Sequence, residues 1–285
     1  MNVISTSFAA EQKHHFLNRA LEPLRPFLDD SQVVEISINS PGQIYVERLG
    51  SAHMEHYEIP ELSADEIVNI GERVAATTNQ FVNRSSPILS AALPTGERIQ
   101  VVLPPAAANG GAVSIRKQVI SNFTLDDYRD QGSLDQVTVA VGGLSETDHK
   151  LIEQLSARDI YGFIRTAILN RVSILISGGT SSGKTTFLNA CLKSVDPHER
   201  IITLEDTREL FPPQNNAVHL LASRGDQGTA SVTIQSLLEA SLRMRPDRLF
   251  VGEVRGSEAF AFLRAINTGH PGSMSTVHAD TPLGA

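Results

Sequence analysis

The chain has 285 residues, of which 41% are hydrophobic and 20% charged, so it has the composition of a globular protein with room for about two domains. Its net charge is −8, it contains no tryptophan and only 5% of its residues are aromatic, so strong direct binding to nucleic acid is not expected. The single cysteine, Cys191, rules out an intramolecular disulfide and a zinc site made of cysteine pairs. No apolar run approaches about 18 residues, so no membrane-spanning helix is predicted.

Residues 1–120 mix strand and helix patterns, which favours an α+β domain. The first helix should weaken at its prolines, and the second begins at the capping-box pattern from Ser63 to Glu66. Alternating apolar residues predict the strands. The expected elements are helices at 9–28 and from 63 onward, and strands at 33–38, 44–49, 53–59, 89–93, 98–103 and 113–116.

Residues 121–150 are rich in Asp, Gln, Gly and Ser and contain the pair Gly142-Gly143. Such a composition is typical of a boundary between domains, although short helices can form within it. We therefore expect an interdomain linker here.

Residues 151–285 are expected to form an α/β domain. A helix is predicted at 160–169, followed by an apolar run at 172–176, a glycine loop and another helix. Two further short apolar runs lie at 201–204 and 249–251. Short strands of this kind, buried on both faces, suit a parallel sheet flanked by helices.

The glycine loop, residues 178–185 (GGTSSGKT), fits G-x-x-x-x-G-K-[ST] at every fixed position and lies between a predicted strand and a predicted helix. Its backbone N–H groups and the helix N-terminus would face the phosphates of ATP. Lys184 would bridge the β- and γ-phosphates, and the Thr185 hydroxyl would bind Mg²⁺. The predicted nucleotide-binding residues are Gly178, Gly179, Thr180, Ser181, Ser182, Gly183, Lys184, Thr185 and Thr186.

Carboxylates follow two of the later apolar runs, in the residues Glu205, Asp206 and Glu209 after the first and Glu253 after the second. Ligand sites of parallel sheets lie at the carboxyl ends of the strands, so these acids should lie beside the phosphates, where hydrolysis requires a positioned water and a second hold on Mg²⁺.

Two histidines, His270 and His278, follow the second of these runs. Metal ligation is a weak reading of them, because neither a cysteine nor a second acidic ligand stands at suitable spacing. Either histidine could instead contact the γ-phosphate or orient an acid.

Four motifs in this order carry a family resemblance: GGTSSGKTT (178–186), ITLEDTREL (202–210), RMRPDRLFVGEVRG (243–256) and NTGHPGSMSTVHAD (267–280). They resemble the Walker A motif, Asp box, Walker B motif and His box of the secretion-ATPase superfamily. Within it the chain most resembles the VirB11-like ATPases of type IV secretion and conjugation. The N-terminal half adds LEPLRPFLDD (21–30), LPTGERIQVVLPP (93–105) and SIRK (114–117) to that resemblance.

The resemblance implies a RecA-like ATPase domain and a homohexameric ring with ATP between the domains. Proteins of this kind usually continue with further helices after the His box, so the domain is expected either to be truncated at its C-terminal end or to be a short form. It implies that Glu209 activates the attacking water, that Glu253 holds Mg²⁺ through water and that His278 helps to set the γ-phosphate site. It also implies that Arg98 and Arg116 reach the phosphates from the N-terminal domain, a role that suits guanidinium groups. From the residues alone, both arginines could equally lie on the solvent face of strands.

The function expected from the resemblance is an ATPase that drives assembly of, or transport through, a type IV secretion or conjugation system. Its ring would work in the cytoplasm, at the cytoplasmic face of the bacterial inner membrane, in peripheral contact with the membrane. Its expected partners are other secretion-channel ATPases and inner-membrane components. The alternatives are a type IV pilus or type II secretion motor and a nucleotide-gated assembly switch with little turnover. The acidic balance and few aromatics count against a DNA translocase.

Overall fold

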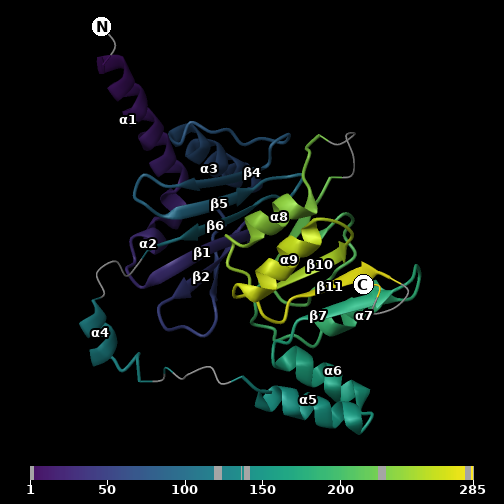
Figure 1. Cartoon of the computed structure of the whole chain (residues 1–285). Helices are drawn as coiled ribbons and strands as arrows, with labels where there is room; N and C mark the ends of the chain where they lie inside the picture. Colours follow the sequence, from purple (N-terminus) through teal and green to yellow (C-terminus); the bar gives the residue numbers. More distant parts are fainter. Residues whose placement is uncertain are drawn as a thin grey trace.

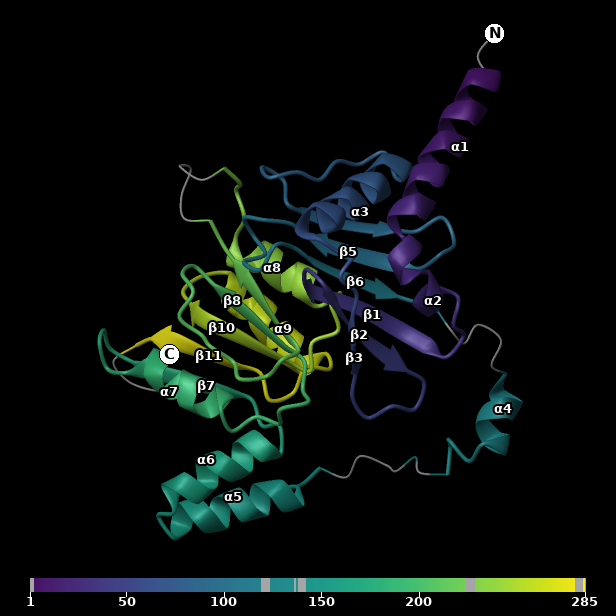
Figure 2. The same ribbon diagram turned by 180° about the vertical axis from the view of Figure 1, so that it is seen from behind.

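A computed structural model describes residues 3–118, 124–135, 137, 142–223, 229–279 and 284, with side chains described from residue 12 onward. The strands of these residues form two separate sheets, one of six strands and one of five. The sheets lie beside each other, each with its own helices (Figures 1 and 2). The predicted fold class is confirmed: a P-loop α/β domain follows an α+β domain.

The first sheet is antiparallel throughout, in the order β3-β2-β1-β6-β5-β4. Helices α1 (Val3–Ala20) and α3 (Ala64–Thr77) pack against each other and share a core with this sheet. The Ser63 side chain caps α3 by accepting the N–H of Glu66, as predicted. The other elements of this part are η1 (Glu22–Leu24), α2 (Arg25–Leu28), β1 (Val33–Ser40), β2 (Gln43–Arg48), β3 (Glu55–Glu58), β4 (Ile88–Ala92), β5 (Arg98–Val102) and β6 (Ala112–Arg116).

The second sheet is parallel, in the order β7-β11-β10-β8-β9. Apolar residues of its strands enter two cores, one shared with α6 and α7 and the other with α8 and α9, so the inner strands are buried on both faces as predicted. The edge strand β7 differs, because its Leu175 is 49% exposed. Its elements are α6 (Ile160–Leu169), β7 (Ile174–Gly178), α7 (Lys184–Leu192), β8 (Ile201–Glu205), β9 (Ala217–Leu221), α8 (Ile234–Ser241), β10 (Arg248–Val254), α9 (Glu258–Asn267) and β11 (Met274–His278).

The region expected to be a linker, residues 121–150, contains α4 (Leu125–Asp130) and the start of α5 (Glu146–Ser156). Helix α4 lies apart from both sheets, whereas α5 pairs with α6 in a hairpin below the second sheet (Figure 1). The exact domain boundaries stay a proposal. Within the described residues, no helix combines the length and apolarity needed to cross a lipid bilayer.

Strand β1 shows how the two halves meet. Its alternating pattern would ordinarily indicate one buried and one solvated face. The isoleucines do enter the core, but Glu35 and Asn39 on the opposite face are also buried, at 1% and 3% exposed. Asn39 Nδ2 donates to Asn216 Oδ1 at 2.8 Å, so the polar face of β1 contacts the second half of the chain.

Backbone pairing and one ion pair strengthen this contact. Ala107 forms an antiparallel bridge with Leu220, which adds a segment of the first half to the free edge of β9. Nearby, Arg245 donates to both carboxylate oxygens of Glu47 at 2.6 Å. The two halves therefore meet through backbone bonds as well as side chains.

Candidate nucleotide site

The glycine loop joins the end of β7 to the first turn of α7 in a conformation that its residues make accessible. Gly183 has φ +87°, which a residue without Cβ adopts at little cost. A Cβ on Gly178 would lie 2.6 Å from Ser182 Oγ, so a larger residue would collide with the loop. Lys184 Nζ donates to the carbonyl oxygens of Gly178 and Gly179 at 2.7 Å each, which holds the ammonium at the loop.

This loop opens onto a pocket of about 1160 Å³, large enough for a nucleotide. Lys184 and Thr185 line it together with Glu209, Glu253 and His278, which come from segments far apart in the sequence. The structure thus brings two of the four predicted acids, Glu209 and Glu253, and one predicted histidine to the pocket at the phosphate loop, whereas Glu205 and Asp206 are not among its lining residues. The other predicted loop residues in its lining are Thr180, Ser181, Ser182, Gly183 and Thr186.

Glu253 lies in β10, next to its last residue, with a side chain that is 25% exposed. Arg255 Nη2 donates to its Oε2 at 2.6 Å, and this bond is the main cause that holds the pKa of Glu253 below its usual value. Arg255 Nη1 also donates to Asp206 at 3.3 Å. The sequence reasoning missed Arg255, although it stands two residues after Glu253 in the Walker B motif.

Glu209 lies four residues beyond the end of β8, on the segment that leaves the sheet. Its side chain is exposed and borders the pocket. Glu205, the last residue of β8, is only 2% exposed, and burial raises the pKa of its carboxyl. Its Oε1 accepts the backbone N–H of Glu209 at 2.7 Å, so it is a neighbour of the site rather than a free acid.

The two histidines lie at opposite ends of the second sheet. His278 ends β11, pairs in register with Gly178 of β7 and lines the pocket. His270 precedes β11, and its Nδ1 donates to the carbonyl oxygen of Pro246, just before β10 begins. The reading of His270 as a phosphate contact is therefore wrong, and its contact is structural.

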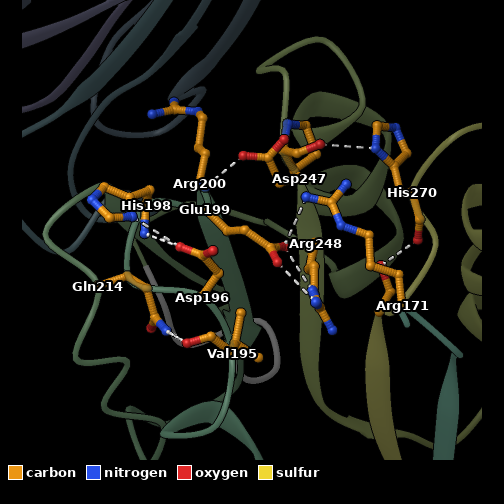
Figure 3. A network of polar contacts seen from close by, with 12 residues as sticks. Arg171, Val195, Asp196, His198, Glu199, Arg200, Gln214, Asp247, Arg248 and His270 are labelled. Atoms are coloured by element: carbon orange, nitrogen blue, oxygen red, sulfur yellow. Dashed lines mark hydrogen bonds and ion pairs between the residues drawn. The ribbon is translucent and has the colours of Figure 1, made fainter. Parts of the chain in front are cut away.

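Figure 3 shows that His270 belongs to a polar network at this opposite end. Arg248, 1% exposed, donates to both oxygens of Glu199 at 2.7 and 2.8 Å, and Arg171 approaches the same carboxylate at 3.4 Å. Asp247 accepts the backbone N–H of Arg200 at 2.7 Å. These contacts tie the first residues of β10 to the residues just before β8, which fixes the strands whose far ends carry the acids.

The structure does not bring Arg98 and Arg116 to the phosphate loop of their own chain. They are paired in register on β5 and β6 and line a second cavity of about 290 Å³. That cavity also contains Glu35, Arg243 and Arg245, which come from both halves of the chain. Neither arginine lines the pocket around Lys184.

Comparisons with known proteins agree with this geometry. The family model described as "Type II/IV secretion system protein" matches residues 18–285. The VirB11 protein of the Bartonella quintana type IV secretion system is 41% identical over 277 aligned residues, covering 93% of this chain and 77% of the relative. VirB11 of Agrobacterium fabrum is 35% identical over 267 residues, covering 92% and 77%.

A solved structure gives the same result for the fold. The VirB11 ATPase of the Brucella suis type IV secretion system, in complex with sulphate, superposes with a TM-score of 0.90 at 37% identity. The match covers 97% of this chain and 80% of that structure. The resemblance stated from the sequence motifs is confirmed, and the chain belongs to the Type II/IV secretion system protein family, among relatives of the VirB11 type.

Proposed function

We propose that this chain is the motor of a type IV secretion system: it is an ATPase of this family, and hydrolysis would drive assembly of the channel or transport through it. One observation carries the proposal. A complete phosphate loop, the two carboxylates Glu209 and Glu253, and His278 line a single pocket. A module that only binds nucleotide has no need for two acids beside the phosphates.

We propose the following roles for the residues that line the pocket. The loop N–H groups and Lys184 bind the β- and γ-phosphates, and Lys184 must leave its two carbonyl partners to do so. Glu209 takes the proton of the attacking water, as an exposed carboxylate at the edge of the pocket can. His278 contributes a hydrogen bond at the γ-phosphate.

The donors at the loop suit Mg²⁺. The Thr185 hydroxyl and the Glu253 carboxylate both line the pocket, and hydroxyl and carboxylate oxygens are its usual ligands. No cluster of three His, Cys, Asp or Glu side chains fit for a metal occurs in the described part of the chain, and Mg²⁺ bound to ATP needs none, since phosphates and waters complete its shell. When bound, Mg²⁺ would neutralise charge that develops on the phosphates.

We further propose that Arg98 and Arg116 act on phosphate only after a rearrangement or across a subunit boundary. Both line a cavity other than the one at Lys184, so they serve a phosphate after the two domains move, or they serve the phosphates held by a neighbouring subunit. Either arrangement would couple nucleotide binding to motion between parts of a ring.

The assembly and location remain proposals of the same kind. We propose a homohexamer that works in the cytoplasm, at the cytoplasmic face of the inner membrane, with peripheral membrane contact. It would meet other channel ATPases and inner-membrane components of the system. Strong direct binding to nucleic acid is not part of the proposal, because the chain is acidic and has few aromatic residues.

The test is a steady-state ATPase assay of the purified chain and its Lys184→Ala variant, combined with light scattering with and without ATP. The variant removes the ammonium at the loop, so turnover should vanish while the circular dichroism spectrum stays the same. Complementation of a gene deletion, scored by transfer of secreted substrate, tests the secretion role. Normal turnover in folded Lys184→Ala would refute the site.

A further inference from the structure

The segment that carries Glu209 is held from two sides. It follows β8 and is not part of any helix or strand, so its own hydrogen bonds do not fix it. Leu210 anchors it in the core, where this side chain is 0% exposed in a cluster that includes Leu188 of α7. The backbone on either side of Leu210 is then bonded by two side chains from different elements.

The first is Glu205 of β8. Its Oε1 accepts the backbone N–H groups of Glu209 and Leu210, at 2.7 and 2.8 Å. This carboxylate therefore fixes the start of the segment relative to the sheet. The Glu205 side chain is only 2% exposed and is not among the residues that line the nucleotide pocket.

The second is Asn189 of α7, the helix that begins at Lys184. Its Nδ2 donates to the carbonyl oxygen of Glu209 at 2.8 Å, and its Oδ1 accepts the backbone N–H of Phe211 at 3.0 Å. The same Nδ2 also lies 3.2 Å from the carbonyl oxygen of Thr185. One amide thus joins the backbone of Thr185 to the backbone on both sides of Leu210.

We propose that Asn189 is a positioning residue for ATP hydrolysis, which sets the distance between the Glu209 carboxylate and the phosphates bound at Lys184 and Thr185. The proposal rests on the proposed role of Glu209 as the base. Nothing in the phosphate-loop motif requires an amide at this place, since its last fixed position is Thr185. The role follows from the three backbone contacts.

The geometry explains why such a residue would matter. Glu209 follows β8 in the sequence, whereas the phosphates would bind at the start of α7. The distance between the Glu209 carboxylate and the phosphates therefore depends on how the segment after β8 packs against that helix. A displacement of about 1 Å between reacting groups can cost 10²-fold in rate. Because the Asn189 amide bonds the backbone of both neighbours of Leu210, it restricts movement of this segment relative to α7 before substrate binds.

The first experiment measures kcat and KM for ATP in the full chain carrying Asn189→Ala. We expect kcat to fall about 10- to 10²-fold while KM changes less than about threefold, because the groups that bind phosphate are untouched. Asn170→Ala is the matched control. Asn170 also donates from Nδ2 to a carbonyl one turn back, that of Thr166 at 2.9 Å, but it follows α6, and its other side-chain partner among the described residues is Thr147 rather than the segment that carries Glu209. Its kcat should stay within twofold of wild type.

The second experiment places Asn189→Ala in a Glu209→Gln background. A residue that acts only through Glu209 has nothing left to position there, so the double variant should turn over within about twofold of Glu209→Gln alone. A residue that merely stabilises α7 would lower turnover by the same factor in both backgrounds. Melting temperatures of both Asn→Ala variants monitor that structural effect.

Four results would count against the positioning role. Wild-type kcat in Asn189→Ala, with Glu209→Gln strongly impaired, would overturn the positioning role and leave the base in place. Equal losses in the two backgrounds, or a loss expressed mainly in KM, would also overturn it. Wild-type kcat in Glu209→Gln would refute the proposed base itself and the positioning role with it.

Discussion

Arg255 and Glu253, which both line the nucleotide pocket, form an ion pair with Nη2 and Oε2 2.6 Å apart. The carboxylate proposed to hold Mg²⁺ is therefore engaged by a cation of its own chain. Arg255 also reaches Asp206, so it links the strand ends of β8 and β10. Its side chain is 58% exposed, which means that solvent screens the pair and that breaking it costs little.

This pair should compete with Mg²⁺. In the Arg255→Gln variant Glu253 is free, so the Mg²⁺ concentration for half-maximal ATPase activity should fall by about two- to fivefold, the range that an exposed ion pair supplies. In Glu253→Gln that concentration should rise, and excess Mg²⁺ should restore part of the rate. Titrating Mg²⁺ at saturating ATP measures both. An unchanged or higher requirement in Arg255→Gln would show that the pair does not compete.

Glu209→Gln should separate binding from chemistry. The variant keeps the shape of the side chain and loses the base, so turnover should fall by roughly 10²–10⁴-fold. Affinity for ATP should stay within a few-fold, because Lys184 and the loop are unchanged. Single-turnover hydrolysis and equilibrium binding of a fluorescent nucleotide measure the two effects. A variant that hydrolyses at the wild-type rate would move the base elsewhere in the pocket.

Stability should depend on the ionisation of Glu35, which lies buried where the two domains meet. Burial raises its pKa to about 7, against the opposing charges of Arg200 and Arg116. An acid whose pKa is higher in the folded state stabilises the fold below its unfolded pKa of about 4.5 and loses that contribution as the pH rises through about 7. The difference between pH 5 and pH 8 amounts to at most about 3 kcal/mol.

Glu35→Gln removes this ionisation, so the difference in stability between wild type and the variant reports the contribution of Glu35 separately from that of the other titrating groups. Urea unfolding of both proteins should give similar stability at pH 5 and a more stable variant at pH 8. Ser90→Ala, at the same cavity, serves as an uncharged control. A difference between wild type and Glu35→Gln that does not change with pH would contradict the raised pKa.

The sequence predicted the phosphate loop and the positions of Glu209 and Glu253 because each depends on local rules. A glycine loop of this motif between a strand and a helix presents backbone N–H groups that suit phosphate, and acids that follow parallel strands gather at one edge of the sheet. Strand β11 was not predicted from the sequence, because Ser275 and Thr276 interrupt the expected apolar pattern although they are 0% and 1% exposed. Their hydroxyls bond backbone carbonyls, which makes polar residues compatible with a buried strand.

Residues whose roles depend on distant neighbours could not be found in this way. In the sequence Asn189 looks like an ordinary helix residue, and only the structure shows that its side chain bonds the backbone of the segment after β8. Glu205 resembles a catalytic acid in the sequence, but burial and two backbone donors give it a structural role. The placement of Arg98 depends on how the two domains meet, which no local pattern encodes.

Arg98 and Arg116 stand opposite each other at the cavity between the domains, and no hydrogen bond or ion pair to either guanidinium occurs within the described residues. If one of them neutralises charge in the transition state, Arg98→Ala or Arg116→Ala should cost far more in turnover than in nucleotide affinity. Arginines of this kind are worth about 10³–10⁵-fold in other phosphoryl-transfer enzymes, and with two side by side the loss here should be smaller.

Rings assembled from two variants would show whether Arg98 acts on phosphate bound by its own subunit or by a neighbouring subunit. Co-expression of Arg98→Ala with Lys184→Ala subunits gives rings in which no single subunit has both groups. If Arg98 acts across a subunit boundary, some pockets combine an intact Lys184 with an intact Arg98 from the neighbour, and the mixture should exceed either variant alone. If Arg98 acts within its own subunit after domain motion, the mixture should remain as inactive as its components. Wild-type turnover in both arginine variants would instead leave the N-terminal domain without a part in the chemistry.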